Sequence, residues 1–327
     1  MSTPADRPGH GSPAARALDA LRTVPPSAGA AVMATGILSM GLRLTGHGVL
    51  SAIALTVATV LWLVLALAFA LQLACDRARW QASAANPPAL TAVAATCVLG
   101  TRYSLAGRQP LALVLLAVAA AAWPWLLVSV LRHWKRPVPG VAFLVCVATQ
   151  GLAVLGGTLA LAGRGDWLAR AALAAGLLGL VLYVEALARF EFRQVFTGQG
   201  DQWVAAGALA ISALAASKLV ASPLWSGGAH QALRDAAFVL LALDFAWYAV
   251  LAVAEFVRPR PGYDLRRWST VFPLGMTAVA ALSTGQVAHV RWLHGVGSVL
   301  LWIAVAAWLL TAVGWGSRAV RRVRATA

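Results

Sequence analysis

The chain has 327 residues, of which 60% are hydrophobic and only 11% are charged, and its mean hydropathy is +0.76. A soluble domain carries about 25% charged residues, so this composition excludes an ordinary soluble protein and indicates a membrane protein. The net charge of +15 lies mostly in short segments between apolar runs, which is typical of cytoplasmic loops and argues against a nucleic-acid partner.

Apolar runs long enough to cross a hydrocarbon core of about 30 Å recur along the chain. Because backbone groups in lipid must be paired within their own segment, helices are the expected spanning elements. We predict an all-α membrane domain over residues 25–316, preceded by a cytoplasmic tail at 1–24 that is not a signal peptide and followed by a basic tail at 317–327. Its ten predicted spans are 25–42, 49–74, 87–101, 110–131, 139–163, 168–192, 203–219, 229–257, 268–288 and 295–316.

The distribution of basic residues predicts the orientation. Eighteen of the 26 Lys and Arg residues lie in the two tails, in the connections after the even spans, or at the end of the sixth span. Cytoplasmic segments of bacterial membrane proteins collect such residues. We therefore expect a multi-pass protein of the cytoplasmic membrane with both termini on the cytoplasmic side, which requires an even number of spans.

Odd and even spans differ in kind. The odd spans contain 15 Ser and Thr residues against 6 in the even spans, and several odd spans begin with proline. This alternation is a weak internal repeat of one hydroxyl-bearing helix and one apolar helix. It predicts five helical hairpins, with an inner ring of odd helices around a central pore and the even helices outside. Alternatively, hydroxyl and small residues serve only to pack helices closely.

Three segments resemble a known family. They are Pro26–Gly41 (PSAGAAVMATGILSMG), Trp268–Gly275 (WSTVFPLG) and Gly200–Trp203 (GDQW). They are similar to helices one and nine, and to the segment before helix seven, of the tellurite-resistance/dicarboxylate transporter family, which includes bacterial TehA-type channels, yeast malate permeases and plant slow anion channels. The resemblance implies five hairpins around a pore, a homotrimer with one pore per subunit, and small inorganic or carboxylate anions as the transported partners.

Charged residues favour an anion as the substrate. The odd spans contain no Asp or Glu, and each is followed or ended by a cation, namely Arg43, Arg102, Arg164, Lys218 and Arg291. If these helices surround a pore, its outer mouth is positive and concentrates anions. The alternative is that these residues only follow the general preference of Lys and Arg for helix C-termini and membrane interfaces.

Six hydroxyl residues on the odd spans are candidates for the pore lining, because hydroxyls can replace part of an anion's hydration. They are Thr35, Ser39, Thr96, Thr149, Ser212 and Thr277. Two acids lie in even spans. Glu185 can pair with Arg189 one turn later, whereas Asp244 has no local partner and belongs either to a structural hydrogen-bond network or to a proton-coupling site.

Phe272 and Pro273 are the predicted gate. In the resembled family a phenylalanine before a proline on the ninth helix plugs the pore. An apolar ring in a narrow pore also leaves an ion without hydration partners, and a proline inside a helix allows a kink. The alternative is a phenylalanine packed between helices.

The leading functional prediction is a passive or weakly gated channel for small anions. Its alternative is a proton-coupled carrier of C4-dicarboxylates such as malate, or a transporter of tellurite- or sulfite-related anions. The sequence has no motif for a catalytic nucleophile, a nucleotide-binding loop or a metal site, and its three cysteines have no metal-ligand spacing. We therefore expect no enzyme activity, cofactor or metal.

Overall fold

The computed structural model describes residues 21–134, 136–259 and 264–326. These residues are almost entirely helical, and their only extended contact is an isolated bridge between Val138 and Phe190. The predicted all-α membrane fold is confirmed. Most of the predicted tail at 1–24 lies outside the described residues, and the segment 317–326 continues the last helix instead of leaving it.

Long helices of two kinds alternate along the chain. The inner helices are α2 (Gly29–Leu44), α5 (Thr91–Leu105), α7 (Leu144–Leu161), α10 (Val204–Val220) and α12 (Trp268–Val287). The outer helices are α3 (Gly48–Cys75), α6 (Gln109–Arg132), α8 (Asp166–Leu187), α11 (Gly227–Val257) and α13 (Arg291–Thr326). Two short helices, α4 (Arg77–Ala84) and α9 (Gln194–Thr197), lie between them.

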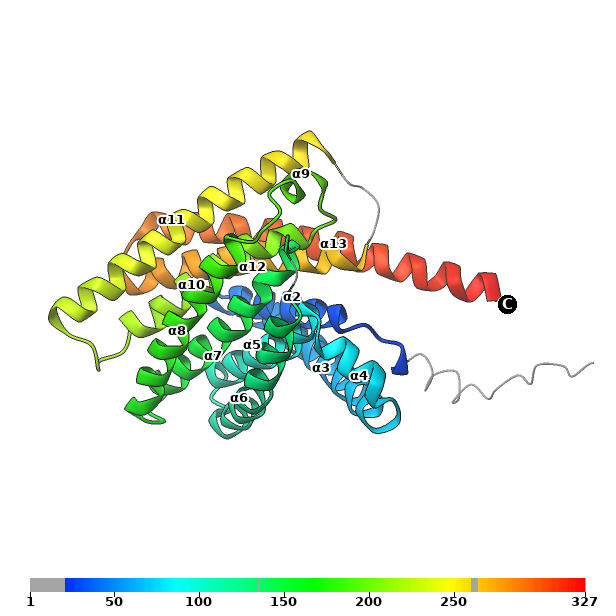
Figure 1. The fold of residues 1–327 in the computed structure, drawn as a ribbon. Coiled ribbons are helices and arrows are strands. Elements are labelled where there is room, and N and C mark those ends of the chain that lie inside the picture. Colours follow the sequence, from blue (N-terminus) through cyan, green and yellow to red (C-terminus); the bar gives the residue numbers. More distant parts are fainter. Residues whose placement is uncertain (1–20, 135, 260–263, 327) are drawn as a thin grey trace, which may run out of the picture.

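The inner helices form a closed ring. α2 packs against α5, α5 against α7, α7 against α10, α10 against α12, and α12 returns to α2. Neighbours approach at increasing residue numbers, as Gly29 does to Thr91 and Gly36 to Val98, so the ring helices run parallel. Each inner helix also packs against the outer helix that follows it, and α11 and α13 run along the outside of the bundle (Figure 1).

Burial separates the two sets of helices. Between 72% and 94% of the most apolar stretch is buried for the spans that contain α2, α7 and α10, against 11% to 33% for the five outer helices. The outer helices expose large apolar side chains such as Val49 and Leu310. Contiguous apolar exposure of this extent suits contact with lipid.

Every inner helix begins with a turn of 3-10 helix. These turns are Pro26–Ala28, Pro87–Leu90, Gly140–Phe143, Asp201–Trp203 and Leu265–Arg267. Proline opens the first two, where its missing N–H costs no intrahelical bond. Among the described residues no outer helix has such a turn, so the alternation seen in the sequence is also an alternation in how helices start.

The number of membrane spans is not fixed by helix length and hydropathy. In the described chain eight helices are long and apolar enough to cross a membrane, or nine if α4 and the following segment to Leu105, which meet at a bend of 91°, count as one span. α5 has only 15 residues, and α12 does not pass by itself. Both helices belong to the inner ring and are covered by outer helices, so they need less apolar surface than a helix that faces lipid. The total of ten spans stays a prediction.

Candidate functional site

A narrow cavity lies on the axis of the inner ring. All five inner helices contribute to its wall. The wall residues are Ile37, Met40, Cys97, Val98, Thr101, Gly151, Val154, Ile211, Leu214 and Met276. The wall is therefore almost wholly apolar, and its one hydroxyl, on Thr101, donates to the Cys97 carbonyl at 2.8 Å.

Phe272 lies one helical turn before the cavity-wall residue Met276 on α12 and is not itself a wall residue. It precedes Met276 by four residues, and residues at this spacing share one face of a helix. Its side chain is only 1% exposed. The adjacent Pro273 packs sideways on α10, where a Cβ placed on Gly207 would lie 2.9 Å from Pro273 Cγ. Because the ring helices run parallel, Phe272 lies on the side of the cavity toward their N-termini.

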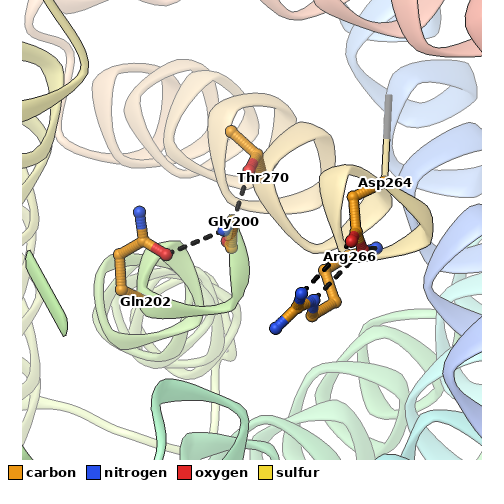
Figure 2. Close-up of polar contacts among 5 residues, drawn as sticks. All are labelled: Gly200, Gln202, Asp264, Arg266 and Thr270. Carbon is orange, nitrogen blue, oxygen red and sulfur yellow. Dashed lines mark hydrogen bonds and ion pairs between the residues drawn. The ribbon is translucent and has the colours of Figure 1, made fainter. Parts of the chain in front are cut away.

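The start of α12 is fastened to the segment before α10 (Figure 2). The Thr270 hydroxyl donates to the Gly200 carbonyl at 3.2 Å, and the Gly200 N–H donates to Gln202 Oε1 at 2.9 Å. Gly200 has a φ of +126°, and a Cβ there would lie 2.8 Å from both the Arg266 carbonyl oxygen and Thr270 Oγ1. Only glycine fits this position, which explains the first residue of the GDQW segment.

Asp264 caps the 3-10 turn that begins α12. Its Oδ1 accepts the backbone N–H of Arg266 at 2.8 Å and the Arg266 Nε–H at 3.1 Å, while Oδ2 accepts from Nη2 at 3.2 Å (Figure 2). The side-chain hydrogen bonds from Arg266 lower the pKa of Asp264 from its ordinary value. This loop thus fixes the register of the helix that carries Phe272.

Three predicted pore hydroxyls are engaged with the outer helices. Thr35 accepts the indole N–H of Trp308, Thr96 that of Trp62, and Thr149 that of Trp123, at 2.9 Å in each case. None of the six predicted pore residues is on the cavity wall. The contacts of these hydroxyls favour a role in joining the two layers of helices.

Ser39 belongs to a buried cluster with Arg102. Its hydroxyl donates to the Ser51 carbonyl and that of Ser51 to the Ser39 carbonyl, both at 2.7 Å. The Arg102 Nε–H donates to Ser39 Oγ at 3.0 Å and its Nη2 to Ser51 Oγ at 2.9 Å. The Arg102 side chain is only 6% exposed, and its hydrogen bonds connect α5, on which it lies, to α2 and α3.

The other four predicted mouth cations differ among themselves. Arg43, Arg164 and Arg291 are exposed at the surface. Lys218 is half-buried near the end of α10, with its Cβ 3.0 Å from a Cβ placed on Gly157 of α7. In the described chain Lys218 has no hydrogen bond or ion pair. Among the predicted mouth cations, Lys218 is the one that is partly buried in the ring and has no hydrogen-bond or ion-pair partner among the described residues.

The two intramembrane acids have different surroundings. Glu185 forms the predicted ion pair with Arg189 on the half-exposed surface of α8. Asp244 of α11 is fully buried, and its Oδ1 lies 3.1 Å from Thr277 Oγ1 of α12. Asp244 Oδ2 has no partner among the described residues.

A profile of the voltage-dependent anion channel family SLAC1 matches residues 23–315, which is most of the chain. The chain belongs to this family. The family resemblance drawn from the three short segments is thereby confirmed, and transport of anions across a membrane is the general function that membership implies. The match covers all of the helical ring, including the axial cavity and Phe272.

Curated relatives of this family member are themselves uncharacterized. Two membrane proteins of Mycobacterium tuberculosis, from strains CDC 1551 and H37Rv, are each 33% identical over 119 residues, which is 34% of this chain. The chain spans 60% of the length of these relatives. They support a membrane protein and give no substrate.

Sequence reasoning missed the apolar wall of the cavity because it searched for hydroxyls. The signal that finds it is helical spacing. Counting four residues on from Phe272 gives Met276, and counting three back from Leu214 gives Ile211. No comparable sequence pattern predicts which neighbouring residue each hydroxyl contacts.

Proposed function

We propose that small anions cross the membrane along the axis of the inner ring, and that the chain acts as a passive or weakly gated channel rather than as an enzyme. The observation that carries the proposal is the axial cavity, whose wall takes residues from all five inner helices of a member of an anion channel family.

Phe272 is the gate of this path. Its full burial and its place on the same helical face as Met276 support a ring that lies beside the cavity. A narrow apolar constriction excludes water, and an ion that enters it loses its hydration without compensation. Displacing the ring of Phe272 therefore lowers the barrier for an anion.

Lys218 supplies positive charge along this path. It has no acidic partner in the described chain, and it lies one turn beyond Leu214 of the cavity wall. An uncompensated cation beside a low-dielectric path attracts anions and repels cations. The inner helices carry no Asp or Glu that would reverse this preference.

The position of Asp244 favours a channel over a proton-coupled carrier. A coupling acid has to exchange protons with the transport path, but Asp244 is fully buried behind Thr277 and is not part of the cavity wall. The carrier of C4-dicarboxylates remains the alternative that the experiment below distinguishes.

The test is the reversal potential of the purified protein in planar bilayers under a gradient of potassium chloride. The proposal expects a potential near the chloride equilibrium value that does not move when a pH gradient is added. A potential near the potassium value overturns anion passage, and a potential that follows the pH gradient supports the carrier. Replacing chloride by nitrate, sulfite, malate or tellurite then ranks the anions.

Assembly and orientation belong to the same proposal. We infer a homotrimer from the family resemblance, and placement in the cytoplasmic membrane with both termini cytoplasmic from the distribution of basic residues. Mass measurement of the detergent-solubilised protein tests the trimer. Reporter fusions after Arg136 and Arg324 test the orientation, and a periplasmic signal at either site refutes it.

A further inference from the structure

A lateral cavity opens between two outer helices of the bundle. Its volume is about 160 Å³, and it lies between α3 and α6 with α5 of the inner ring behind it. On α3 it is lined by Trp62, Ala66 and Phe69, whose spacing puts them on one helical face. Val118 of α6 also lines the cavity and is 49% exposed, so the cavity reaches the surface that contacts lipid.

The wall of this lateral cavity is apolar. Ala92 and Ala95 of α5 and Ala122 of α6 contribute small side chains, which leave the space unfilled. The polar side chains of the wall already have partners. The Trp62 indole N–H donates to Thr96 Oγ1 at 2.9 Å, and the Thr96 hydroxyl donates to the Ala92 carbonyl at 2.7 Å. The wall therefore suits an apolar guest, since apolar cavities of about 150 Å³ stay dry and bind apolar molecules.

The short helix α4 lies at the end of this cavity where the inner helices begin, which is the end predicted to be cytoplasmic. α4 packs against the end of α3 (Figure 1) and against α6, and it meets the segment Pro87–Leu105 at a bend of 91°. Trp80 of α4 stacks on Trp125 of α6, with ring centroids 4.7 Å apart. Trp125 comes three residues after Ala122 of the wall, so the stacked pair lies about one turn beyond the cavity. Tryptophan is enriched at the membrane interface, which places this end of the cavity near the lipid head groups.

Two arginines accompany the tryptophan pair. Arg77 precedes Trp80 by three residues and shares its face of α4. Arg132 follows Trp125 by seven residues and shares its face of α6. Both arginines are exposed, and in the described chain neither side chain has a hydrogen bond or ion pair. Basic clusters at the cytoplasmic ends of membrane helices bind the head groups of anionic lipids.

Positive charge exceeds negative charge around this end of the cavity. The described segments 21–28, 71–88 and 125–134 meet there, and Asp76 is their single acid. Asp76 Oδ2 lies 3.9 Å from Arg79 Nε, so this acid already has a cation beside it. The arginines of the three segments are Arg22, Arg77, Arg79 and Arg132. An anionic head group is therefore favoured here over a zwitterionic one.

We propose that the lateral cavity binds one acyl chain of an anionic phospholipid, with the phosphate of the same lipid beside Arg77 and Arg132. The cavity opens to the membrane, where lipid chains are the abundant apolar groups, and the arginines select the head group by charge. A helix of a second copy is about 10 Å across and is too wide to enter a cavity of this volume. The bound chain packs against Ala92 and Ala95, so it supports α5 from the outside. This binding does not rest on the proposed function.

Native mass spectrometry of the purified protein in detergent tests the site by counting bound lipids. The probes are dioleoyl phosphatidylglycerol, which is anionic, and dioleoyl phosphatidylcholine, which is zwitterionic. The parent should bind phosphatidylglycerol severalfold more tightly than phosphatidylcholine. Ala66→Phe fills the cavity and should lose the most tightly bound lipid of either kind. Leu67→Phe is the matched control and should bind as the parent does, because Leu67 is 53% exposed and lies outside the cavity.

The head-group contact is tested apart from the cavity. Arg77→Gln combined with Arg132→Gln leaves the cavity intact, so phosphatidylcholine should still bind while the preference for phosphatidylglycerol falls severalfold. Arg170→Gln, at an exposed position of α8, should keep the preference of the parent.

Three outcomes overturn the proposal. If Ala66→Phe is folded and binds both lipids as the parent does, no acyl chain lies in the cavity. If the double arginine variant keeps the full preference for phosphatidylglycerol, the head group lies elsewhere. If filling the cavity changes the mass of the oligomer, a second copy covers it. Ala122→Phe fills the cavity from α6 and replaces Ala66→Phe if that variant does not fold, and the double arginine variant decides if neither folds. None of these outcomes depends on whether the protein conducts anions.

Discussion

Replacing Phe272 by alanine tests the gate. The side chain is only 1% exposed, so its loss removes buried apolar contacts and leaves a cavity, at a cost of about 3–5 kcal/mol in stability. Phe143 is a matched control. It is 0% exposed, but its ring packs against Tyr183 at 5.2 Å and Phe190 at 5.5 Å, away from the axis. Both substitutions should cost similar stability, and only Phe272→Ala should change transport.

The size of the transport effect follows from the barrier. Phe272 shares a helical face with Met276 of the cavity wall, so the space that its loss vacates should extend the axial cavity toward the N-termini of the ring helices. Each 1.4 kcal/mol removed from the barrier raises a rate about tenfold. An apolar ring that strips an ion of water imposes at least a barrier of that size. We expect the anion conductance of Phe272→Ala to exceed that of the parent by about tenfold or more, and Phe272→Leu to lie between them.

Native cysteines provide a second assay. Cys97 is on the wall of the axial cavity, whereas Cys146 lies between α7 and α10, with its Sγ 3.8 Å from the Ala208 carbonyl. In a Cys75→Ser background, which removes the exposed thiol, a water-soluble thiol reagent should label Cys97 in Phe272→Ala faster than in the parent. Cys146 should stay protected in both.

One outcome refutes the reasoning. If Phe272→Ala is folded, reaches the membrane and neither conducts more than the parent nor exposes Cys97, Phe272 is a packing residue. An equal increase in Phe143→Ala has the same meaning, because it shows that any loss of buried ring volume loosens the bundle.

Three further predictions concern other parts of the site. Gly200→Ala should lower the unfolding temperature in detergent by an amount equivalent to about 1–3 kcal/mol, because alanine is strained at a φ of +126° and its Cβ meets the Arg266 carbonyl. An unchanged unfolding temperature would contradict the conclusion that only glycine fits this position. Lys218→Ala should reduce anion conductance severalfold at low salt and less at high salt, because salt screens the charge. Arg291→Ala is the control and should leave the conductance unchanged. Equal effects of the two substitutions would show that Lys218 has no particular role in attracting anions to the path. The pKa of Asp264 is lowered in the folded protein, so its ionised form adds stability above the unfolded value of 3.8, and this is lost as the pH falls through the folded value. The stability difference between the parent and Asp264→Asn should thus be present at neutral pH and vanish in strong acid; a constant difference would mean that the charge contributes nothing.

The alternation of helices was predictable from sequence because it depends on composition. Hydroxyls and glycines concentrate in helices that face protein, while leucine and tryptophan concentrate in helices that face lipid. Helix starts followed from proline, as at Pro26 and Pro87. The number of spans was less secure, since an inner helix such as α12 is shielded from lipid and need not be strongly apolar.

Side-chain partners were beyond sequence reasoning. Thr35 and Trp308 form a hydrogen bond although they are 273 positions apart, and no local spacing encodes that contact. Arg102 looked like a mouth cation because it ends an odd span, but serines on two other helices draw it inward. Asp244 lacked a partner within a helical turn, whereas in the fold the next helix supplies Thr277. The position of a residue along a helix predicts its depth in the membrane. The neighbour that its side chain contacts depends on how the helices pack in the fold.

The parallel order of the inner helices has an electrical consequence. Each helix has a dipole equivalent to about half a positive charge at its N-terminus and half a negative charge at its C-terminus. In an antiparallel ring of helices these dipoles cancel, but the dipoles of the five inner helices point the same way along the axis of the ring. Arg43, Arg102 and Lys218 lie in the last turns of their helices and offset the negative end. An anion on the axis therefore meets an unequal field at the two ends, and the current it carries should differ with the sign of the applied voltage.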